Sequence, residues 1–276
     1  MGSRLPKNLP PVGRTTPAVI YHYTNLIGLR GVLQGKNIRA GRYNRMNDPS
    51  EFRHAVCVLG RWRIKRRFED AGPAEKWGAH IMDLYEQYPH YIVSFCEDGD
   101  SSTQRETYGH YAIGFRTERL RQKVNLRTGG QFTKMDYSDA NKFGILDNLF
   151  RGDPVREPLN ALPSLLKFKK EDSSSELEWR LVGRPSGFRD GKKASSIVEG
   201  KTVEFIEVAL LEGDIEVVVL GPTESSPENQ RAIEQLVASR GFQVRVETSP
   251  LRYEDPRTSI TTRCSPMSSS PPNNAD

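Results

Sequence analysis

The sequence predicts an α+β fold, and three observations support this class. Short segments of alternating polar and apolar residues predict strands, and longer segments with apolar residues at helical spacing predict helices. The two kinds of segment follow one another without the regular strand-helix-strand alternation of a doubly wound parallel sheet. The 276 residues suffice to bury a sizeable core around such a sheet.

Strands are predicted wherever branched and aromatic residues alternate with polar ones. The first, AVIYHYT, places His22 on one face with Ile20 and Thr24. The segment SSSELEWRLVG (173–183) contains another strand, in which Glu176, Glu178 and Arg180 would share a charged face. The remaining expected strands cover 90–97, 111–116, 202–211, 215–222 and 242–249.

Helices are predicted from apolar spacing and from capping residues. The first, at 24–35, is capped by Thr24 or Asn25, and the last, at 227–240, ends at Gly241, a usual residue after a helix. Further helices are expected at 50–69, 140–149 and 159–168. We expect a polar loop at 97–110 and a loop rich in Gly, Lys and Arg at 183–196.

The composition is that of a globular protein, with 36% hydrophobic and 9% aromatic residues. No apolar run reaches the roughly 18 residues of a membrane helix, so no membrane partner is expected. The N-terminus lacks the apolar stretch of a secretory signal, which predicts a cytoplasmic protein. Cys57, Cys96 and Cys264 match no zinc or disulfide spacing, so we expect reduced thiols. A pI near 9.1 favours an anionic partner such as a nucleotide or nucleic acid.

The chain divides into one folded domain and two tails. Residues 1–17 are rich in proline, glycine and basic residues, which predicts a flexible arm. Residues 254–276 have the serine, proline and asparagine content of a disordered tail. A single domain is therefore expected at 18–253.

Candidate functional residues lie on three of the predicted strands. His22 lies on the first, Ser94 shares a face with Ile92 and Cys96 on the second, and the Glu176-x-Glu178 pair lies on a later one. Each signal alone also fits a structural role: a strand histidine is often a hydrogen-bonded core residue, and a charged strand face often meets water. Together they predict that His22, Ser94 and Glu178 line one cleft.

Two further segments could contact a ligand. In NDPSEF, Asn47 and Asp48 could reach the cleft from a turn, although Asp48 or Ser50 could equally be the cap of the next helix. Tyr108 stands before the strand at 111–116 and could touch a ligand or pack.

The basic run RWRIKRRF (61–68) could bind nucleic acid or simply form a solvated helix face.

From Ile20 to Tyr253 the chain resembles the bacterial domain-of-unknown-function family numbered 2971. The resemblance is carried by the start YHYT, the turn NDPSEF, the serine-containing strand YIVSFCEDGD, the strand ELEWRLV and the ending from VVLGP to LRY. This family supplies no activity by itself.

The ordered set of His22, Ser94 and Glu-x-Glu also resembles the three-motif plan of ADP-ribosyltransferases. This resemblance implies a single domain with a split, mainly antiparallel sheet and flanking helices, with NAD as the substrate and no metal. His22 would bind the adenosine-side ribose of NAD, Tyr23 would stack near the nicotinamide, and Ser94 would line the same site.

The carboxylates would act on the bond to nicotinamide. Glu178 would accept a hydrogen bond from the 2′-OH of the nicotinamide ribose, because a fixed carboxylate stabilises an oxocarbenium-like transition state more than the ground state. Glu176 would orient or deprotonate the incoming nucleophile. Arg180 would meet a phosphate or hold Glu178 in place.

We therefore expect transfer of ADP-ribose from NAD to a nucleic acid or protein acceptor. An alternative is a non-catalytic nucleotide- or nucleic-acid-binding module of a bacterial defence or stress system. A third hypothesis, metal-dependent phosphodiester cleavage by His22, Asp48 and the two glutamates, has no compact ligand motif to support it.

Overall fold

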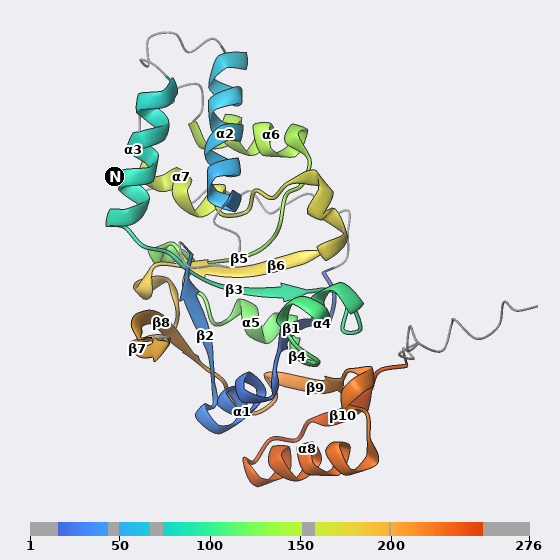
Figure 1. The fold of residues 1–276 in the computed structure, drawn as a ribbon. Helices are drawn as coiled ribbons and strands as arrows, with labels where there is room; N and C mark the ends of the chain where they lie inside the picture. The colour runs from blue at the N-terminus through green and yellow to red at the C-terminus, as the bar shows by residue number, and fades with distance from the viewer. Residues whose placement is uncertain (1–15, 44–49, 67–73, 151–157, 199, 251–276) are drawn as a thin grey trace, which may run out of the picture.

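The computed structural model describes residues 16–43, 50–66, 74–150, 158–198 and 200–250 (Figure 1). Most of the predicted arm, the predicted tail at 254–276, and both Asn47 and Asp48 lie outside these ranges. No helix within the described ranges is long and apolar enough to cross a membrane.

The described strands form one ten-stranded sheet in the order β10-β9-β4-β1-β3-β2-β8-β7. Outside this order, β6 pairs with β3, and β5 pairs with β6. All pairs are antiparallel except β9 with β10, so the predicted α+β class with a mainly antiparallel sheet is confirmed. The strands are β1 Val19–Thr24, β2 Asn37–Arg42, β3 Tyr91–Cys96, β4 Tyr111–Arg116, β5 Gln131–Lys134, β6 Glu178–Gly183, β7 Lys192–Val198, β8 Lys201–Ala209, β9 Ile215–Leu220 and β10 Arg245–Thr248.

The helices flank this sheet, and the five that the sequence predicts are present. They are α1 Leu26–Gly35, α2 Ser50–Lys65, α3 Ala74–Gln87, α4 Ser102–Tyr108, α5 Thr117–Arg121, α6 Asp139–Phe150, α7 Pro158–Leu165 and α8 Pro227–Ser239. Asn25, rather than Thr24, caps α1 by accepting a hydrogen bond from the Gly28 amide.

Two expected loops are wrong. The segment 97–110 contains α4, because STQRETY has no apolar spacing by which to recognise a helix but does have a capping serine, Ser101. The segment 183–196 contains most of β7, which lies at an edge of the sheet and is largely exposed, so its sequence shows no buried apolar face. The strand ladder with β8, rather than burial, defines β7.

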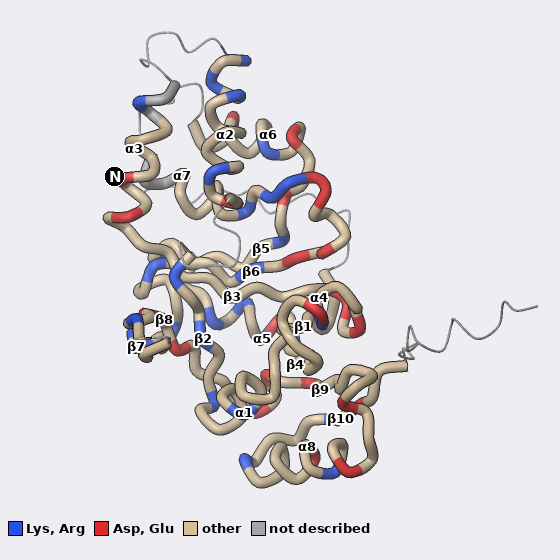
Figure 2. Tube along the Cα trace, viewed as in Figure 1, with Lys and Arg blue, Asp and Glu red and all other residues tan. Residues whose placement is uncertain are grey.

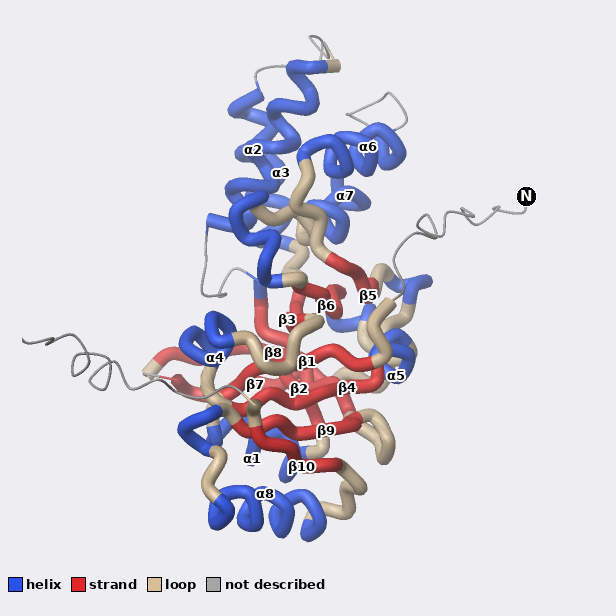
Figure 3. Tube along the Cα trace, turned by 90° about the vertical axis from the view of Figure 1, so that its right-hand side faces the viewer, coloured by secondary structure: helices blue, strands red, loops and turns tan. Residues whose placement is uncertain are grey.

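Two separate cores hold the helices to the sheet. The larger core joins one face of the sheet to α1 and α8, through residues such as Leu29 and Ile233. The second core joins Ile92 of β3 and Val182 of β6 to α2, α3, α6 and α7. Figure 3 shows the consequence: α1 and α8 lie at one end of the molecule, and the four-helix lobe lies at the other.

The middle of β3 is left without a strand partner on one edge. On that edge β3 pairs with β2 only at Tyr91 and Ile92, and with β1 only at Cys96. Its other edge pairs with β6 along its whole length. The sheet therefore has a gap beside Val93–Phe95, bordered by β1 and β2.

Helix α4 is fixed next to this gap by buried contacts at both of its ends. Arg105, 3% exposed, pairs with Asp100 at 2.8 Å and donates to the carbonyl oxygens of Gly99 and His110. Gly109 ends the helix with φ of 120°, a backbone conformation that favours glycine. A Cβ atom at Gly109 would lie 2.6 Å from the backbone of Thr24 and Asn25.

We expect Gly109→Ala to lower the free energy of unfolding by at least about 2 kcal/mol, because the new Cβ would meet backbone atoms and the positive φ would be strained. Gly144→Ala is the control: a Cβ there meets no atom within 4 Å in the middle of α6, so it should raise stability by up to about 1 kcal/mol. Denaturant unfolding of both variants measures this. Equal changes in the free energy of unfolding in the two variants would contradict the close approach of α4 to β1.

Candidate functional site

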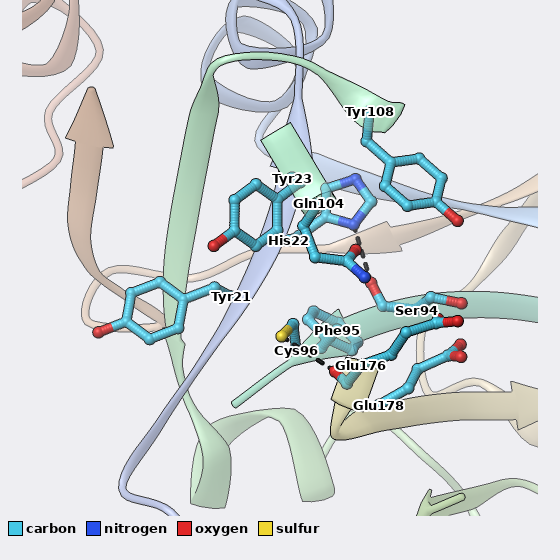
Figure 4. A pocket seen from close by; sticks show the side chains of 10 residues that line it. All are labelled: Tyr21, His22, Tyr23, Ser94, Phe95, Cys96, Gln104, Tyr108, Glu176 and Glu178. Carbon is cyan, nitrogen blue, oxygen red and sulfur yellow. Dashed lines mark hydrogen bonds between the residues drawn. The ribbon is translucent and has the colours of Figure 1, made fainter. Parts of the chain in front are cut away.

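The gap in the sheet opens into a cleft made of two adjoining hollows. The narrow hollow has a volume of about 60 Å³ and the wider one about 280 Å³, close to the lower end of small-molecule pockets. Both are lined by His22, Ser94, Tyr108 and Glu176, so they form one continuous cleft. Glu178 lines the narrow hollow (Figure 4). The structure thus brings His22, Ser94 and both glutamates together.

At the gap, the His22 side chain binds a backbone group of β3 that has no partner on a neighbouring strand of the described sheet. Its Nδ1 lies 3.0 Å from the carbonyl oxygen of Ser94. A carbonyl oxygen only accepts, so Nδ1 carries the proton and donates. Desolvation by burial lowers the pKa of His22, although the hydrogen bond to Ser94 acts in the opposite direction. The neutral imidazole then has an unprotonated Nε2 that can accept a hydrogen bond from a ligand.

Ser94 and Tyr108 provide two hydroxyl groups at the cleft. The Ser94 Oγ is buried and makes no hydrogen bond within the described part of the chain. Tyr108 belongs to α4 and is 42% exposed. Both residues line the two hollows, and the Ser94 hydroxyl has no partner among the described residues.

Tyr23 lines the narrow hollow, but its hydroxyl is already occupied. It donates to the carbonyl oxygen of Asp98 at 2.8 Å and accepts from the Ser101 amide at 2.9 Å. These bonds hold the start of α4, and the tyrosine is 6% exposed. Tyr23 is thus held at the narrow hollow by the same segment that carries Gln104 and Tyr108.

Glu178 and Arg180 lie side by side on β6 in a buried ionic cluster. Arg180 has no exposed surface, and it donates to Glu178 Oε1 at 2.5 Å from Nε and to Glu178 Oε2 at 3.1 Å from its terminal nitrogen. It also donates to Glu51 Oε2 at 2.7 Å and to the carbonyl oxygen of Leu166 at 3.1 Å. Arg180 therefore holds Glu178 in place, one of its two predicted roles, and is not exposed to a phosphate.

The charged side of the strand in ELEWRL is buried. In a simple half-buried strand this side would face water. All six residues of β6 are buried, because the four-helix lobe covers the side that carries Glu178 and Arg180. Trp179 points to the other face, stacks on Phe132 with ring centres 5.2 Å apart, and donates to Glu97.

Two members of this cluster were not predicted as site residues. Glu51, in the first turn of α2, contacts Arg180, and Lys169, between α7 and β6, contacts Glu51, Glu176 and Glu178. Figure 2 shows basic and acidic positions following one another in the segment between α7 and β6. A motif for Lys169 is absent from the sequence, since its partners lie on separate elements. Glu51 belongs to the NDPSEF turn and could have been found there.

The ionic cluster keeps Glu178 charged. Burial acts to raise the pKa of this carboxyl group, but the charges of Arg180 and Lys169 outweigh it and lower the pKa to about 2. The folded protein therefore binds a proton at Glu178 less readily than the unfolded chain does. Its contribution to stability is present above the ordinary glutamate pKa and is lost as the pH falls toward 2.

We expect the stability difference between the wild type and Glu178→Gln to depend on pH. Near pH 7 the variant removes a carboxylate that pairs with Arg180 and Lys169, and its free energy of unfolding should be lower than that of the wild type by about 3 kcal/mol. The difference should shrink as the pH falls from about 4.5 to about 2, where the wild-type carboxyl is also neutral. Denaturant unfolding at several pH values measures it. A difference that is constant with pH would contradict an ionic role for Glu178.

Glu176 does not lie on the strand, which corrects the expected position. It ends the 3-10 helix η4, Glu171–Glu176, and β6 begins only at Glu178. Between them Leu177 has φ of 45°, a left-handed conformation that costs a residue with a side chain about 1 kcal/mol. This turn lets Glu176 and Glu178 contact the same Lys169 nitrogen. Glu176 keeps its Oε2 on Lys169 and lines both hollows.

Leu177 offers a test of this backbone turn. Leu177→Gly and Leu177→Ala remove nearly the same side chain, but only glycine adopts the left-handed conformation without strain. The glycine variant should therefore be more stable than the alanine variant by about 1 kcal/mol. At Thr133 in the extended strand β5 the order should reverse, because glycine weakens a strand. Thermal unfolding of the four variants gives the comparison, and alanine ranking above glycine at both positions would rule out the turn.

The basic segment of α2 contacts α6 rather than the cleft. In the part of RWRIKRRF that the structure describes, Arg61 pairs with Asp139 at 2.8 Å, and Trp62 and Arg66 donate to Asp147 of α6 at 2.8 and 2.9 Å. Trp62 is 1% exposed, so it cannot serve as a stacking surface. These contacts favour the structural interpretation of this helix.

The metal hypothesis gains no support from the described residues. Among them, no group of three or more His, Cys, Asp or Glu side chains is placed to hold a metal ion. Asp48, which that hypothesis also requires, lies outside the described ranges.

Comparison of the chain with models of protein families, with curated proteins and with solved structures finds no match. The chemistry of the cleft therefore follows from its own residues. They provide a neutral imidazole, the hydroxyls of Ser94 and Tyr108, one buried and one partly exposed carboxylate, the cation Lys169 on the wall of the wider hollow, and the buried cation Arg180 behind Glu178.

Proposed function

We propose that the protein is an NAD-dependent ADP-ribosyltransferase that acts on a nucleic acid or protein acceptor, with an ADP-ribosyltransferase-like fold. The observation that carries this proposal is the meeting of His22, Ser94, Glu176 and Glu178 in one cleft at the gap in the sheet. The segments that supply them are far apart in the chain.

The distribution of charge along the cleft supports NAD as the ligand. Among the described residues, the narrow hollow is lined by the carboxylates of Glu176 and Glu178 and by no lysine or arginine. The wider hollow adds three cations, Arg39, Lys169 and Lys170, and one further carboxylate, Glu51. NAD has a matching polarity, because its nicotinamide ring is cationic and its pyrophosphate is anionic. The nicotinamide end would enter the narrow hollow, with the phosphates toward Arg39.

The chemistry suits this orientation. When the bond between C1′ of the ribose and the nicotinamide nitrogen breaks, the bonding electrons leave with nicotinamide and positive charge develops on the ribose. Carboxylates fixed beside that charge stabilise it without reorganising. The acceptor nucleophile then forms a bond to C1′, and its proton passes to a nearby base.

The two glutamates differ in how they can contribute. Glu178 is 5% exposed and both of its oxygens accept from Arg180, so it acts mainly as a fixed negative charge. Glu176 pairs with Lys169 through Oε2, is more exposed than Glu178 and lines both hollows, so it is the better placed group to accept the proton of the nucleophile. His22 would accept from a ribose hydroxyl through Nε2.

One observation favours the alternative of a non-catalytic nucleotide-binding module. The cations that engage Glu178 and Glu176 also make them a structural cluster that ties β6 to α2 and to the segment after α7. A purely structural cluster would still leave Ser94, His22, Arg39 and Lys170 to bind a nucleotide.

The proposal is tested by incubating the protein with labelled NAD and cell extract and measuring nicotinamide release and labelled product. Glu176→Gln and Glu178→Gln should each lower nicotinamide release by at least about a hundredfold, because each removes a carboxylate from the developing charge. Glu234→Gln on α8 is the matched control: it makes the same change at an exposed position on the far helix and should keep full activity.

The outcome separates the two functions. Release by the wild type that both cleft variants lose supports the transferase. No release by a folded wild type that still binds NAD in calorimetry would overturn the transferase and support the binding module. Circular dichroism and thermal unfolding of every variant show whether the protein is folded.

A further inference from the structure

Lys169 joins the carboxylates on the wall of the cleft. Its Nζ lies 2.7 Å from Glu178 Oε2 and 3.4 Å from Glu51 Oε1, and it also pairs with Glu176 Oε2. Its side chain is 7% exposed, so these contacts are made largely away from water. One ammonium group therefore serves three carboxylates from three different elements.

Arg180 does not duplicate this role. Its contacts reach Glu178, Glu51 and the Leu166 carbonyl oxygen. In the described part of the chain, Lys169 is the cation that pairs with Glu176. Lys170, the next residue, contacts the Ser50 hydroxyl at 3.3 Å instead.

We infer that Lys169 is a positioning residue that holds the carboxylate of Glu176 beside Glu178 at the cleft. The role of that carboxylate toward NAD rests on the proposed function, but the ion pairs themselves do not. An ammonium group suits this task because its three protons can point to three acceptors at once.

The electrostatic balance explains why the cluster needs Lys169. With it, two cations face three carboxylates; without it, Arg180 would remain, and Arg180 contacts Glu51 and Glu178 but not Glu176. Glu176 is the most exposed of the three and would be left without this ion pair, so its side chain could turn toward water. That movement would remove the proposed base from its place.

The other groups around Lys169 do not replace its charge. Tyr108 of α4 and Tyr137 near β6 face the same carboxylates, and burial raises the pKa of both phenols, so they stay neutral near pH 7. Among the described residues, Lys169, Cys96, Tyr108 and Tyr137 interact with the Glu176 carboxyl group, and of these only Lys169 is a cation.

The test follows the side-chain carboxyl resonance of Glu176 by NMR at neutral pH in protein with labelled glutamate. In Lys169→Met this resonance should move toward the position of a solvent-exposed glutamate, because the ammonium group that holds the carboxylate is gone. Lys169→Arg should keep the resonance close to its wild-type position, since a guanidinium group also donates to carboxylates. Lys170→Met is the matched control, since it removes the neighbouring lysine but no ion pair of Glu176, and the resonance should not move. Lys169→Gln replaces the methionine variant if that variant does not fold.

Two results would overturn the inference: a Glu176 resonance in Lys169→Met at its wild-type position, or an equal movement in Lys170→Met. The measurement needs no catalysis, so it decides the role of Lys169 even if the wild type releases no nicotinamide, a result that would count against the proposed function alone. If the wild type is active, Lys169→Met should lower nicotinamide release and Lys169→Arg should restore most of it. An unchanged rate in Lys169→Met would count against the inference.

Discussion

The placement of the helical lobe depends on the burial of Arg180. A guanidinium group with no exposed surface is stable only if its hydrogen-bond donors and its charge are satisfied inside the protein. Glu178 on the same strand, Glu51 at the start of α2 and the carbonyl oxygen after α7 satisfy it. Each partner comes from a different element, so the requirement of one side chain orients all of them. Removing one partner of a buried ion pair typically costs about 3 to 5 kcal/mol.

The same cluster forms the wall of the cleft. Glu176 and Glu178 face the narrow hollow from one side, and their cations stand behind them in the protein. The opposite side is made by His22, which completes the hydrogen bonding of β3, and by α4, which Arg105 and Tyr23 hold. The stability of the fold and the shape of the site are thus properties of the same contacts, so substitutions in this cluster need a stability measurement beside any functional one.

Periodicity was enough to find the strands that carry the site. β1, β3 and β6 have apolar alternation, so His22, Ser94 and Glu178 could be placed on strands from the sequence. The sequence did not predict β2, because only Ile38 and Ala40 are buried in this strand and two residues are too short a pattern to recognise.

Other features depend on tertiary contacts that no local pattern records. The left-handed turn at Leu177 was missed because turns of this kind are usually marked by glycine. Lys169 was missed because a lysine in LKFKKED looks like a surface residue until its three carboxylate partners are brought to it by the fold.

The pairing of β2 with β3 has a consequence for how the molecule can change. Gly41 and Ile92 are neighbours in the sheet, although α2 and α3 lie between them in the chain. The helical pair is thus an excursion from the sheet that starts and ends at neighbouring positions, and its described contribution to the cleft wall is Glu51, in the first turn of α2. The second core holds this pair against β3 and β6, so a shift of the pair along the sheet would move one wall of the cleft.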